Sequence, residues 1–353
     1  MAVSRINEAG LNVNQYGNRN LIINGAMQVA QRGTSFTNPS VSAYTLDRWS
    51  TVYSHDGAVD VSQSTTAPAG FKNSLKIDVT TADSSLSSSQ YYILQQPIEG
   101  QNLSHLNYGS SDAKEVTISF WVRSNKTGTY YVEIQTSGSQ ELARPYTINT
   151  ANTWEHKTLT WIANTDFTIT ETNASGVILY WWLAGGSAYT GSPLATTWAN
   201  NTNRITGQTN FLDSTSNELY ITGVQLEVGD TATDFEHRTF ADELVKCQRY
   251  CLVLDSGIAF GTYGFVGFAE NSTTAKVIVS FPVHMRAAPS LARSGSFAYD
   301  GASGNPTISS TGATNTPFCS RIEDAVSGAT QGEGLILINS NDSDAKLTFD
   351  AEL

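Results

Sequence analysis

The sequence predicts an all-β protein: an antiparallel jelly-roll β-sandwich, followed by a short helix and a smaller C-terminal β-sandwich domain. Charged residues make up only 15% of the 353 residues, and Gly, Ser, Thr and Asn carry most of the polar balance. That composition favours strands and turns over helices. Many short segments also alternate between apolar and polar residues and end in Gly, Asn, Ser or Thr turns, which is typical of sandwiches.

The first half of the chain contains the clearest strand patterns. Residues 1–19 are polar with little hydrophobic period, so we expect an arm that needs a partner to become ordered. Residues 20–30 predict a short apolar strand. Residues 116–123 and 129–135 alternate on either side of an SNKTG turn, which predicts a hairpin with one buried face. Further strands are expected at 156–163, at 176–186 in a central position, and at 217–229 with a bulge near Gly223.

One segment, Phe240 to Cys251, has a helical period. Four of its residues fall on one helical face, and acidic residues open the segment while basic residues close it, which suits the helix dipole. Strand patterns return after it. The predicted plan is therefore an arm at 1–19, a jelly roll at 20–238, a connecting helix at 239–251 and a second β domain at 252–353.

The charge balance excludes several kinds of partner. The formal net charge is −12, and Lys and Arg form no cluster, so we expect no nucleic acid, whose phosphates are bound by clustered basic residues.

No stretch reaches the ~18 apolar residues of a membrane span, so we expect no membrane insertion. The N-terminal residues lack the apolar core of a secretory signal, and three Cys fit a reducing compartment, which indicates synthesis in the cytoplasm.

Five segments together resemble a known family. They are NLIINGAMQVAQRGTSF (20–36), LDRW (46–49), VTISFWVRSNKTGTYYVEI (116–134), NTWEHKTLTW (152–161) and YITGVQLEVGDTATDFEHRTFADELVKCQRY (220–250). The chain is similar there to bacteriophage virion proteins, often tail-fibre or minor tail components. Those proteins carry a jelly roll similar to carbohydrate-binding modules, then a CQRYY-type helix and a variable C-terminal domain.

The resemblance implies a tail fibre or tip that binds glycan on the host cell surface. It implies a homotrimer, attached to other virion proteins through residues 1–19, whose ligand is a host polysaccharide or lipopolysaccharide. The protein would then be made in the host cytoplasm and located on the tail or capsid surface of the virion. The alternative is a capsid decoration, head-fibre or tail-hub structural protein without sugar binding.

The sequence departs from the family pattern at a calcium site. Many modules of this type have acidic residues in an N-G-x-F-E opening and in a late Y-x-D strand, and these help to hold a structural calcium. The corresponding positions here are Gln28 and Thr222. Because calcium prefers carboxylate oxygens, we expect no metal or other cofactor, with backbone carbonyls as the remaining candidate ligands for a structural calcium.

A candidate glycan-binding face comes from the alternation of the strands. A sugar ring stacks on flat aromatic side chains while fixed polar groups bind its hydroxyls. The alternation puts four such side chains on the outer face of adjacent strands: Trp121, Arg123, Tyr131 and Glu133. Tyr180 and Trp182 lie on one face of the central strand and extend this candidate face. The alternative is that a loop or a neighbouring subunit covers this face and the aromatic side chains serve packing alone.

Two other features have both a functional and a structural interpretation. Trp198 lies in a polar loop and is either a ligand platform or a plug over the core. His237 and Arg238, in the FEHR motif of the resembled family, are either functional or the cap of a strand end.

No arrangement of residues points to catalysis. A glycosidase needs two carboxylates facing each other across a cleft, about 5–9.5 Å apart, and no spacing in the sequence singles out such a pair. No G-x-S-x-G elbow is present, and the five His are scattered without metal-ligand spacing. We therefore expect that the protein is not an enzyme.

Overall fold

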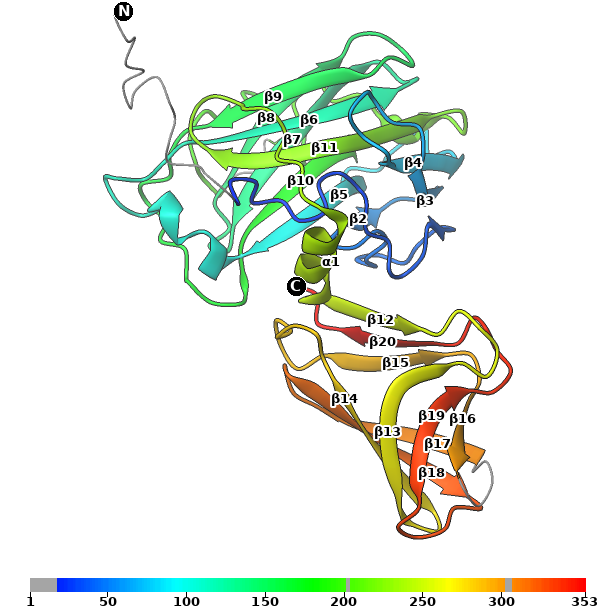
Figure 1. The fold of residues 1–353 in the computed structure, drawn as a ribbon. Coiled ribbons are helices and arrows are strands. Elements are labelled where there is room, and N and C mark those ends of the chain that lie inside the picture. Colours follow the sequence, from blue (N-terminus) through cyan, green and yellow to red (C-terminus); the bar gives the residue numbers. More distant parts are fainter. Residues whose placement is uncertain (1–17, 201–203, 302–306) are drawn as a thin grey trace, which may run out of the picture. The chain divides into compact units, whose positions relative to one another are not determined.

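The computed structural model describes residues 18–200, 204–301 and 307–353, so most of the predicted arm lies outside the described residues. The chain divides into two compact units, Met1–Thr239 and Phe240–Leu353 (Figure 1). Nearly all regular elements of both units are strands, which confirms the predicted all-β class. No helix among the described residues is long and apolar enough to cross a membrane.

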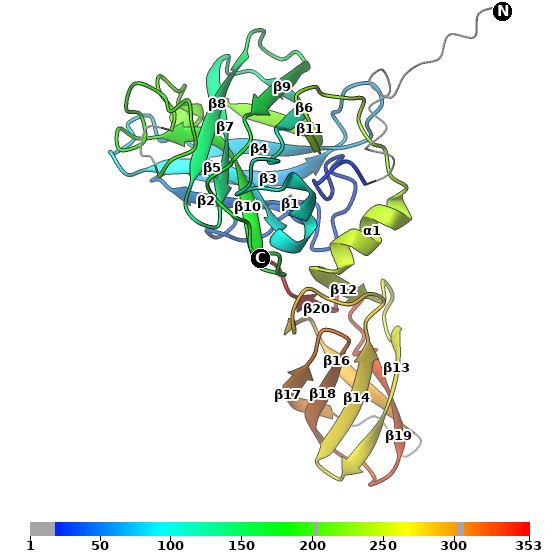
Figure 2. The ribbon, with the colours of Figure 1, turned by 90° about the vertical axis from the view of Figure 1, so that its left-hand side faces the viewer.

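The first unit is a sandwich of two antiparallel sheets (Figure 2). The six-stranded sheet has the order β1-β3-β4-β11-β6-β9, and the five-stranded sheet has the order β2-β5-β10-β7-β8. The strands are β1 (Ser35–Phe36), β2 (Ser50–Ser54), β3 (Ala58–Ser64), β4 (Ser74–Thr81), β5 (Tyr91–Glu99), β6 (Val116–Ser124), β7 (Gly128–Thr136), β8 (Glu141–Ile148), β9 (Glu155–Trp161), β10 (Ser175–Gly185) and β11 (Glu218–Val228). Three 3-10 turns connect them: η2 (Gly100–Asn102), η3 (Ser104–Leu106) and η4 (Phe211–Asp213).

The core of this unit fills the space between the two sheets. Alternate residues of β6 and β7 are buried in it, as their pattern predicts. Three tryptophans are almost fully buried there: Trp49, Trp161 and Trp181. The indole nitrogens of Trp49 and Trp161 donate to the carbonyls of Asn24 (3.1 Å) and Leu142 (2.6 Å), so these two large rings are buried without an unmet donor.

The predicted hairpin of β6 and β7 is wrong. β6 pairs with β9 and β11 in the six-stranded sheet, whereas β7 pairs with β8 and β10 in the five-stranded sheet. The short SNKTG link therefore crosses from one sheet to the other. Both strands bury a face in the same core, so the alternation predicted the buried side chains correctly but not the neighbouring strand.

Two other strand predictions are confirmed and one is wrong. β10 lies in the interior of its sheet, between β5 and β7. β11 has a register shift between Thr222 and Gln225, where Gly223 has a φ of 61°. Residues 20–30 form a turn instead of a strand, because the buried Asn24 side chain donates to the carbonyls of Val29 (2.8 Å) and Asp47 (3.0 Å) and holds the backbone folded.

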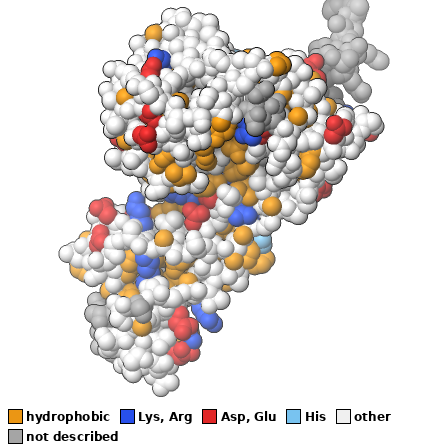
Figure 3. All heavy atoms as spheres, turned by 180° about the vertical axis from the view of Figure 1, so that it is seen from behind, with side chains coloured by type: hydrophobic (Ala, Val, Ile, Leu, Met, Phe, Trp, Pro, Cys, Tyr) orange, Lys and Arg blue, Asp and Glu red, His pale blue; other side chains and the backbone are white. Residues whose placement is uncertain are grey.

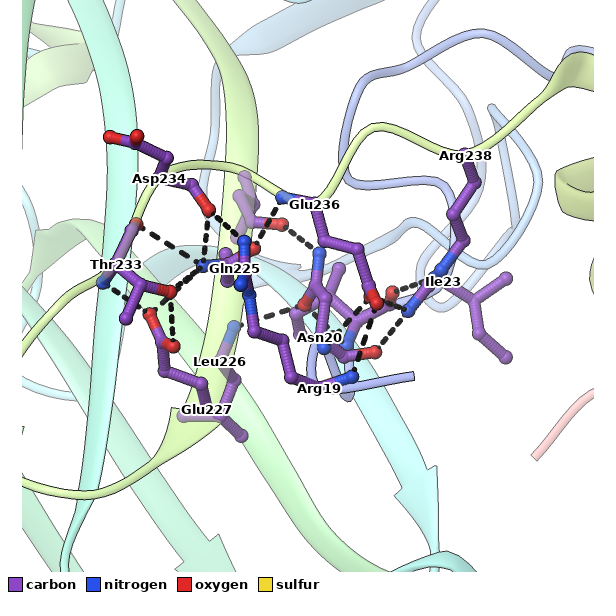
Figure 4. Close-up of polar contacts among 12 residues, drawn as sticks. Arg19, Asn20, Ile23, Gln225, Leu226, Glu227, Thr233, Asp234, Glu236 and Arg238 are labelled. Atoms are coloured by element: carbon purple, nitrogen blue, oxygen red, sulfur yellow. Dashed lines mark hydrogen bonds and ion pairs between the residues drawn. The ribbon is translucent and has the colours of Figure 1, made fainter. Parts of the chain in front are cut away.

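The ends of the first unit are joined by a polar cluster that we call the terminal clamp: Arg19, Asn20, Glu236 and Arg238 (Figure 4). Arg238 pairs with Glu236 (2.8 Å) and donates to the carbonyls of Asn20 and Ile22. Glu236 accepts from the backbone nitrogens of Arg19 (3.3 Å) and Asn20 (3.1 Å). Arg238 of the FEHR motif thus has a structural role, since it binds the end of the unit to its beginning.

The second unit starts with α1 (Phe240–Gln248), which is shorter than the predicted helix because Cys251 already belongs to a strand. A three-stranded sheet has the order β12-β20-β15, and six strands close a barrel in the order β13-β14-β18-β17-β16-β19 where a second sandwich was predicted. The strands are β12 (Cys251–Asp255), β13 (Thr262–Asn271), β14 (Thr274–Ser280), β15 (Ser290–Ser294), β16 (Phe297–Gly301), β17 (Thr307–Asn315), β18 (Cys319–Ser327), β19 (Gly334–Asn339) and β20 (Lys346–Asp350).

Candidate functional site

The six predicted site residues lie on two different outer faces of the sandwich. Trp121 and Arg123 are on β6 of the six-stranded sheet. The other four are on β7 and β10 of the five-stranded sheet: Tyr131, Glu133, Tyr180 and Trp182. The prediction of one shared face is therefore wrong, because the chain changes sheets between β6 and β7.

The outer face of the five-stranded sheet is covered by chain. The covering segment, which we call the strap, consists of the described residues 186–200 and 204–210 between β10 and η4. Tyr131 and Trp182 are buried under it in a cluster with Ile205. The Tyr131 hydroxyl donates to the carbonyl of Thr206 in the strap. Tyr131 and Trp182 therefore pack under a loop, which is the structural alternative to a glycan-binding face.

An ionic group fixes the strap to the sheet. Arg204 approaches Glu141 on β8 (2.6 Å) and Glu133 on β7 (3.7 Å). Trp182 donates its indole N–H to Glu133 at 2.8 Å. Glu133 is fully buried, and this burial raises its pKa to about 7 despite the attraction of Arg204. The group is therefore a buried anchor whose charge depends on pH near neutrality.

The outer face of the six-stranded sheet is open only in part. Residues 229–234 bond to the buried Thr117, Gln225 and Glu227 at one end, whereas the other end is partly exposed. Tyr220 on β11 is the register partner of Lys76 on β4 and of Arg123 on β6, so the three side chains form a row across the sheet. The Arg123 guanidinium lies 5.1 Å and the Lys76 ammonium 5.9 Å from the centre of the Tyr220 ring. The ring of Trp154, next to β9, meets Tyr220 edge to face at 6.3 Å.

A second aromatic row lies beside the first. Trp121 on β6 is the register partner of His156 on β9, and their ring centres are 5.1 Å apart. Both Trp121 and Trp154 are partly exposed, and His156 is exposed. We call these two rows, with Glu218, the open face: Lys76, Trp121, Arg123, Trp154, His156, Glu218 and Tyr220.

Polar contacts hold the open face in shape. Lys76 forms ion pairs with Glu218 (2.6 Å) and Asp78 (3.0 Å), and the Tyr220 hydroxyl donates to Glu218 (2.9 Å). The hydrogen bond from Lys76 lowers the pKa of Glu218. Arg123 is fixed from the other side, because its Nε donates to the carbonyl of Asn152 at 3.0 Å. The face therefore offers flat rings together with oriented charged groups.

The sequence pattern missed the five open-face residues outside β6: Lys76, Trp154, His156, Glu218 and Tyr220. Tyr220 and Glu218 alternate with the buried Leu219, so the pattern of β11 contained a signal for their outward direction. The alternation does not predict the strand order, in which β4, β11, β6 and β9 are neighbours, because these strands are distant in the sequence.

Two remaining side chains, Trp198 and Thr222, have structural contacts in this unit. The Trp198 indole donates to the carbonyl of Ile162 at 2.9 Å, and its ring packs on Tyr108 at 6.0 Å, as expected for a plug. The buried Thr222 hydroxyl donates to the carbonyl of Asn73 at 2.8 Å. Among the described residues, no three His, Cys, Asp or Glu side chains come together in a group that could hold a metal ion.

Comparisons with known proteins give partial likenesses of the fold. No protein-family model matches the chain, and no curated protein matches it. It is similar to the enzymatically active domain of tailspike protein 4 from bacteriophage CBA120, with 12% identity and a TM-score of 0.29 over 60% of this chain and 21% of that one. The match therefore spans about a fifth of the tailspike domain.

Two complete modules are also similar. One is the family 11 carbohydrate-binding module of the cellulase Lic26A-Cel5E from Clostridium thermocellum, with 9% identity and a TM-score of 0.29, over 58% of this chain and 98% of the module. The other is a putative sugar binding protein from Bacteroides thetaiotaomicron, with 14% identity and a TM-score of 0.34, over 59% and 99%. Because these TM-scores are below 0.5, the function has to be argued from the site itself.

Proposed function

We propose that the protein binds glycan without cleaving it, and that the open face of the six-stranded sheet is the binding surface. The observation that carries this proposal is the pair of aromatic rows, Trp154–Tyr220 and Trp121–His156, on one rigid sheet. Trp121 and Trp154 are partly exposed and His156 is exposed, whereas the Tyr220 ring is buried. A pyranose ring stacks its apolar face on such rings, while Arg123 and Glu218 offer a donor and an acceptor to its hydroxyls. Two solved structures with similar folds are described as carbohydrate-binding and sugar-binding proteins.

The biological setting is part of the same proposal. The five sequence segments that resemble phage virion proteins support a tail fibre or tip that attaches the particle to a host polysaccharide or lipopolysaccharide. The similarity to a phage tailspike domain agrees with this setting. A homotrimer would present three open faces, and avidity would strengthen contacts that are weak individually.

The structural alternative, a capsid decoration, head-fibre or tail-hub protein without sugar binding, has one observation in its favour. The outer side of the barrel exposes large apolar side chains, and two of them, Val266 and Ile336, are register partners on adjacent strands. Exposed apolar patches of this kind occur where neighbouring proteins pack.

The test is a glycan array probed with the full chain and with Trp121→Ala and Trp154→Ala. Each substitution removes one stacking ring, so we expect the signal for the bound glycan to fall at least tenfold while the circular dichroism spectrum stays unchanged. Phe318→Ala is the matched control, because Phe318 is an exposed aromatic residue of the second unit. Normal binding by both tryptophan variants would eliminate the open face as the site.

A further inference from the structure

The barrel of the second unit has a weak seam between β16 and β17. Among the described residues, a single register pair joins these strands, Ala298 with Thr307. In contrast, β16 pairs along its whole length with β19, and β17 pairs from Thr307 to Asn315 with β18. The next described residues, Phe297 and Ile308, are not register partners, so the strands separate on the Phe297 side of the Ala298–Thr307 pair.

A cavity of about 460 Å³ lies at this seam. Phe297 lines it from β16, and Ile308, Ser309 and Thr311 line it from β17. Arg293 and Ser296 complete the same wall. Cavities of several hundred Å³ with an apolar wall and a few polar groups are typical of small-molecule sites. We call this cavity the seam pocket.

Buried side chains hold Arg293 in place. Asp324 is fully buried and accepts from Arg293 Nη2 (2.9 Å) and from the Tyr299 hydroxyl (2.6 Å) through the same oxygen. The Arg293 guanidinium also lies 5.1 Å from the centre of the Phe297 ring. An arginine fixed on two sides in this way loses little conformational freedom when a ligand binds it.

The lining chemistry indicates the class of ligand. Hydroxyls of Ser296, Ser309 and Thr311 can donate to and accept from a polyhydroxylated molecule, and Phe297 and Ile308 offer it an apolar wall. Arg293 is the only charged residue among the described lining residues, and its Nε has no hydrogen-bond partner. A ligand carboxylate would meet this guanidinium as a second partner beside Asp324. Another carboxylate, that of Asp342, accepts from the backbone nitrogen of the lining residue Ser296 at 2.8 Å.

We propose that the seam pocket binds a single sugar residue that carries a carboxylate, as a site separate from the open face. Arg293 binds the carboxylate, the serine and threonine hydroxyls bind the sugar hydroxyls, and Phe297 packs against the ring. No Asp or Glu is among the described lining residues, so the pocket lacks the carboxylate pair of a glycosidase and binds without hydrolysis.

The experiment is a calorimetric titration of the full chain with matched methyl glycosides. The acidic probes are methyl glucuronide, methyl galacturonide and methyl N-acetylneuraminide, and the neutral probes are methyl glucoside and methyl galactoside. We expect saturable binding of at least one acidic probe, at least tenfold tighter than the neutral probes, because only the carboxylate engages Arg293. The proposal is overturned if no acidic probe binds or if neutral and acidic probes bind equally.

Four variants locate the site. Ser309→Trp fills the pocket from an exposed position at the β17 bulge and should abolish binding, without removing the Arg293–Asp324 pair. Arg293→Gln should remove the preference for the acidic probe, whereas Arg321→Gln, a change of a half-exposed arginine on the same barrel, should not. Trp121→Ala should leave this binding intact; if it abolishes the binding, the sugar occupies the open face and the seam-pocket proposal fails.

Discussion

At the scale of single residues, burial decides what each predicted site residue does. Trp182 and Glu133 have the chemistry of a sugar site, yet both are almost inaccessible under the strap. Trp121 and Arg123 have the same chemistry on an exposed sheet surface. Aromatic rings and carboxylates also pack well in a protein interior when their polar atoms are paired. Such a side chain therefore indicates a binding site only if it is accessible to a ligand.

Glu133 gives a prediction about pH. Its folded pKa of about 7 is above the ordinary value of 4.5, so the folded protein binds a proton that the unfolded chain has released between these pH values. This contribution to the free energy of unfolding therefore falls as the pH rises from 4.5 to 7. Glu133→Gln keeps an acceptor for Trp182 and does not titrate. Relative to the wild type, the variant should gain up to roughly 3 kcal/mol of stability across this range.

Urea unfolding of both proteins at a series of pH values measures that difference. Glu218→Gln is the matched control, because the hydrogen bond from Lys76 lowers the pKa of Glu218. The stability that Glu218 contributes is lost only as the pH falls below its ordinary value, so this control should run parallel to the wild type between pH 5 and 7. A parallel profile for Glu133→Gln would contradict an ionisable buried Glu133.

At the scale of elements, the bulge in β11 determines the shape of the open face. Gly223 has a φ of 61°, and a Cβ there would lie 2.6 Å from the Phe71 ring and 3.0 Å from the Trp121 ring. The glycine thus lets two aromatic side chains approach the backbone on the sheet surface.

Gly223→Ala tests the bulge. We expect a loss of about 2–4 kcal/mol in the free energy of unfolding, from left-handed backbone strain together with the clash against Phe71. Gly207→Ala is the control, since Gly207 has a φ of 72° and open space where a Cβ would lie, so it should lose only the strain of about 1 kcal/mol. If chemical denaturation showed equal losses of unfolding free energy for the two variants, the close approach of Phe71 would not contribute to the cost of Gly223→Ala.

The strands also show how far the sequence predicts this fold. The alternation of apolar and polar residues identifies which side chains of β6, β7 and β11 are buried, because successive side chains of a strand point to opposite faces of the sheet. The alternation cannot identify strand partners, so it does not predict that the chain crosses between sheets from β6 to β7. The residues predicted to share one face therefore lie on two faces. The turn at 20–30 was missed because a buried Asn24 side chain competes with strand hydrogen bonds, and the strap was missed because its residues have no period.

At the scale of the whole molecule, the small share of charged residues and the exposed apolar side chains bear on the proposed oligomer. Most of the face in Figure 3 consists of uncharged atoms, in agreement with the 15% of charged residues. On the barrel, Val266 is 71% and Phe268 is 50% exposed, and both lie on β13 two residues apart.

The resemblance to phage virion proteins implies a homotrimer, so we expect a trimer in solution. Multi-angle light scattering of the purified chain should give a mass three times the 38.1 kDa of one chain. The mass should remain the same at high salt, because burial of apolar surface is not screened by ions. A monomeric mass at micromolar concentration would contradict both the avidity argument and the virion setting.

The terminal clamp has a consequence for mechanical load. The chain enters the sandwich at Arg19 and leaves it at Arg238, and Arg238 and Glu236 bind the entry segment directly. If the unit is pulled by its two ends, the clamp is stretched first, while the hydrogen bonds inside the sheets are spared. Tension would therefore pass across one small cluster at the edge of the sandwich, and the binding surface could keep its geometry while the ends of the unit are under force.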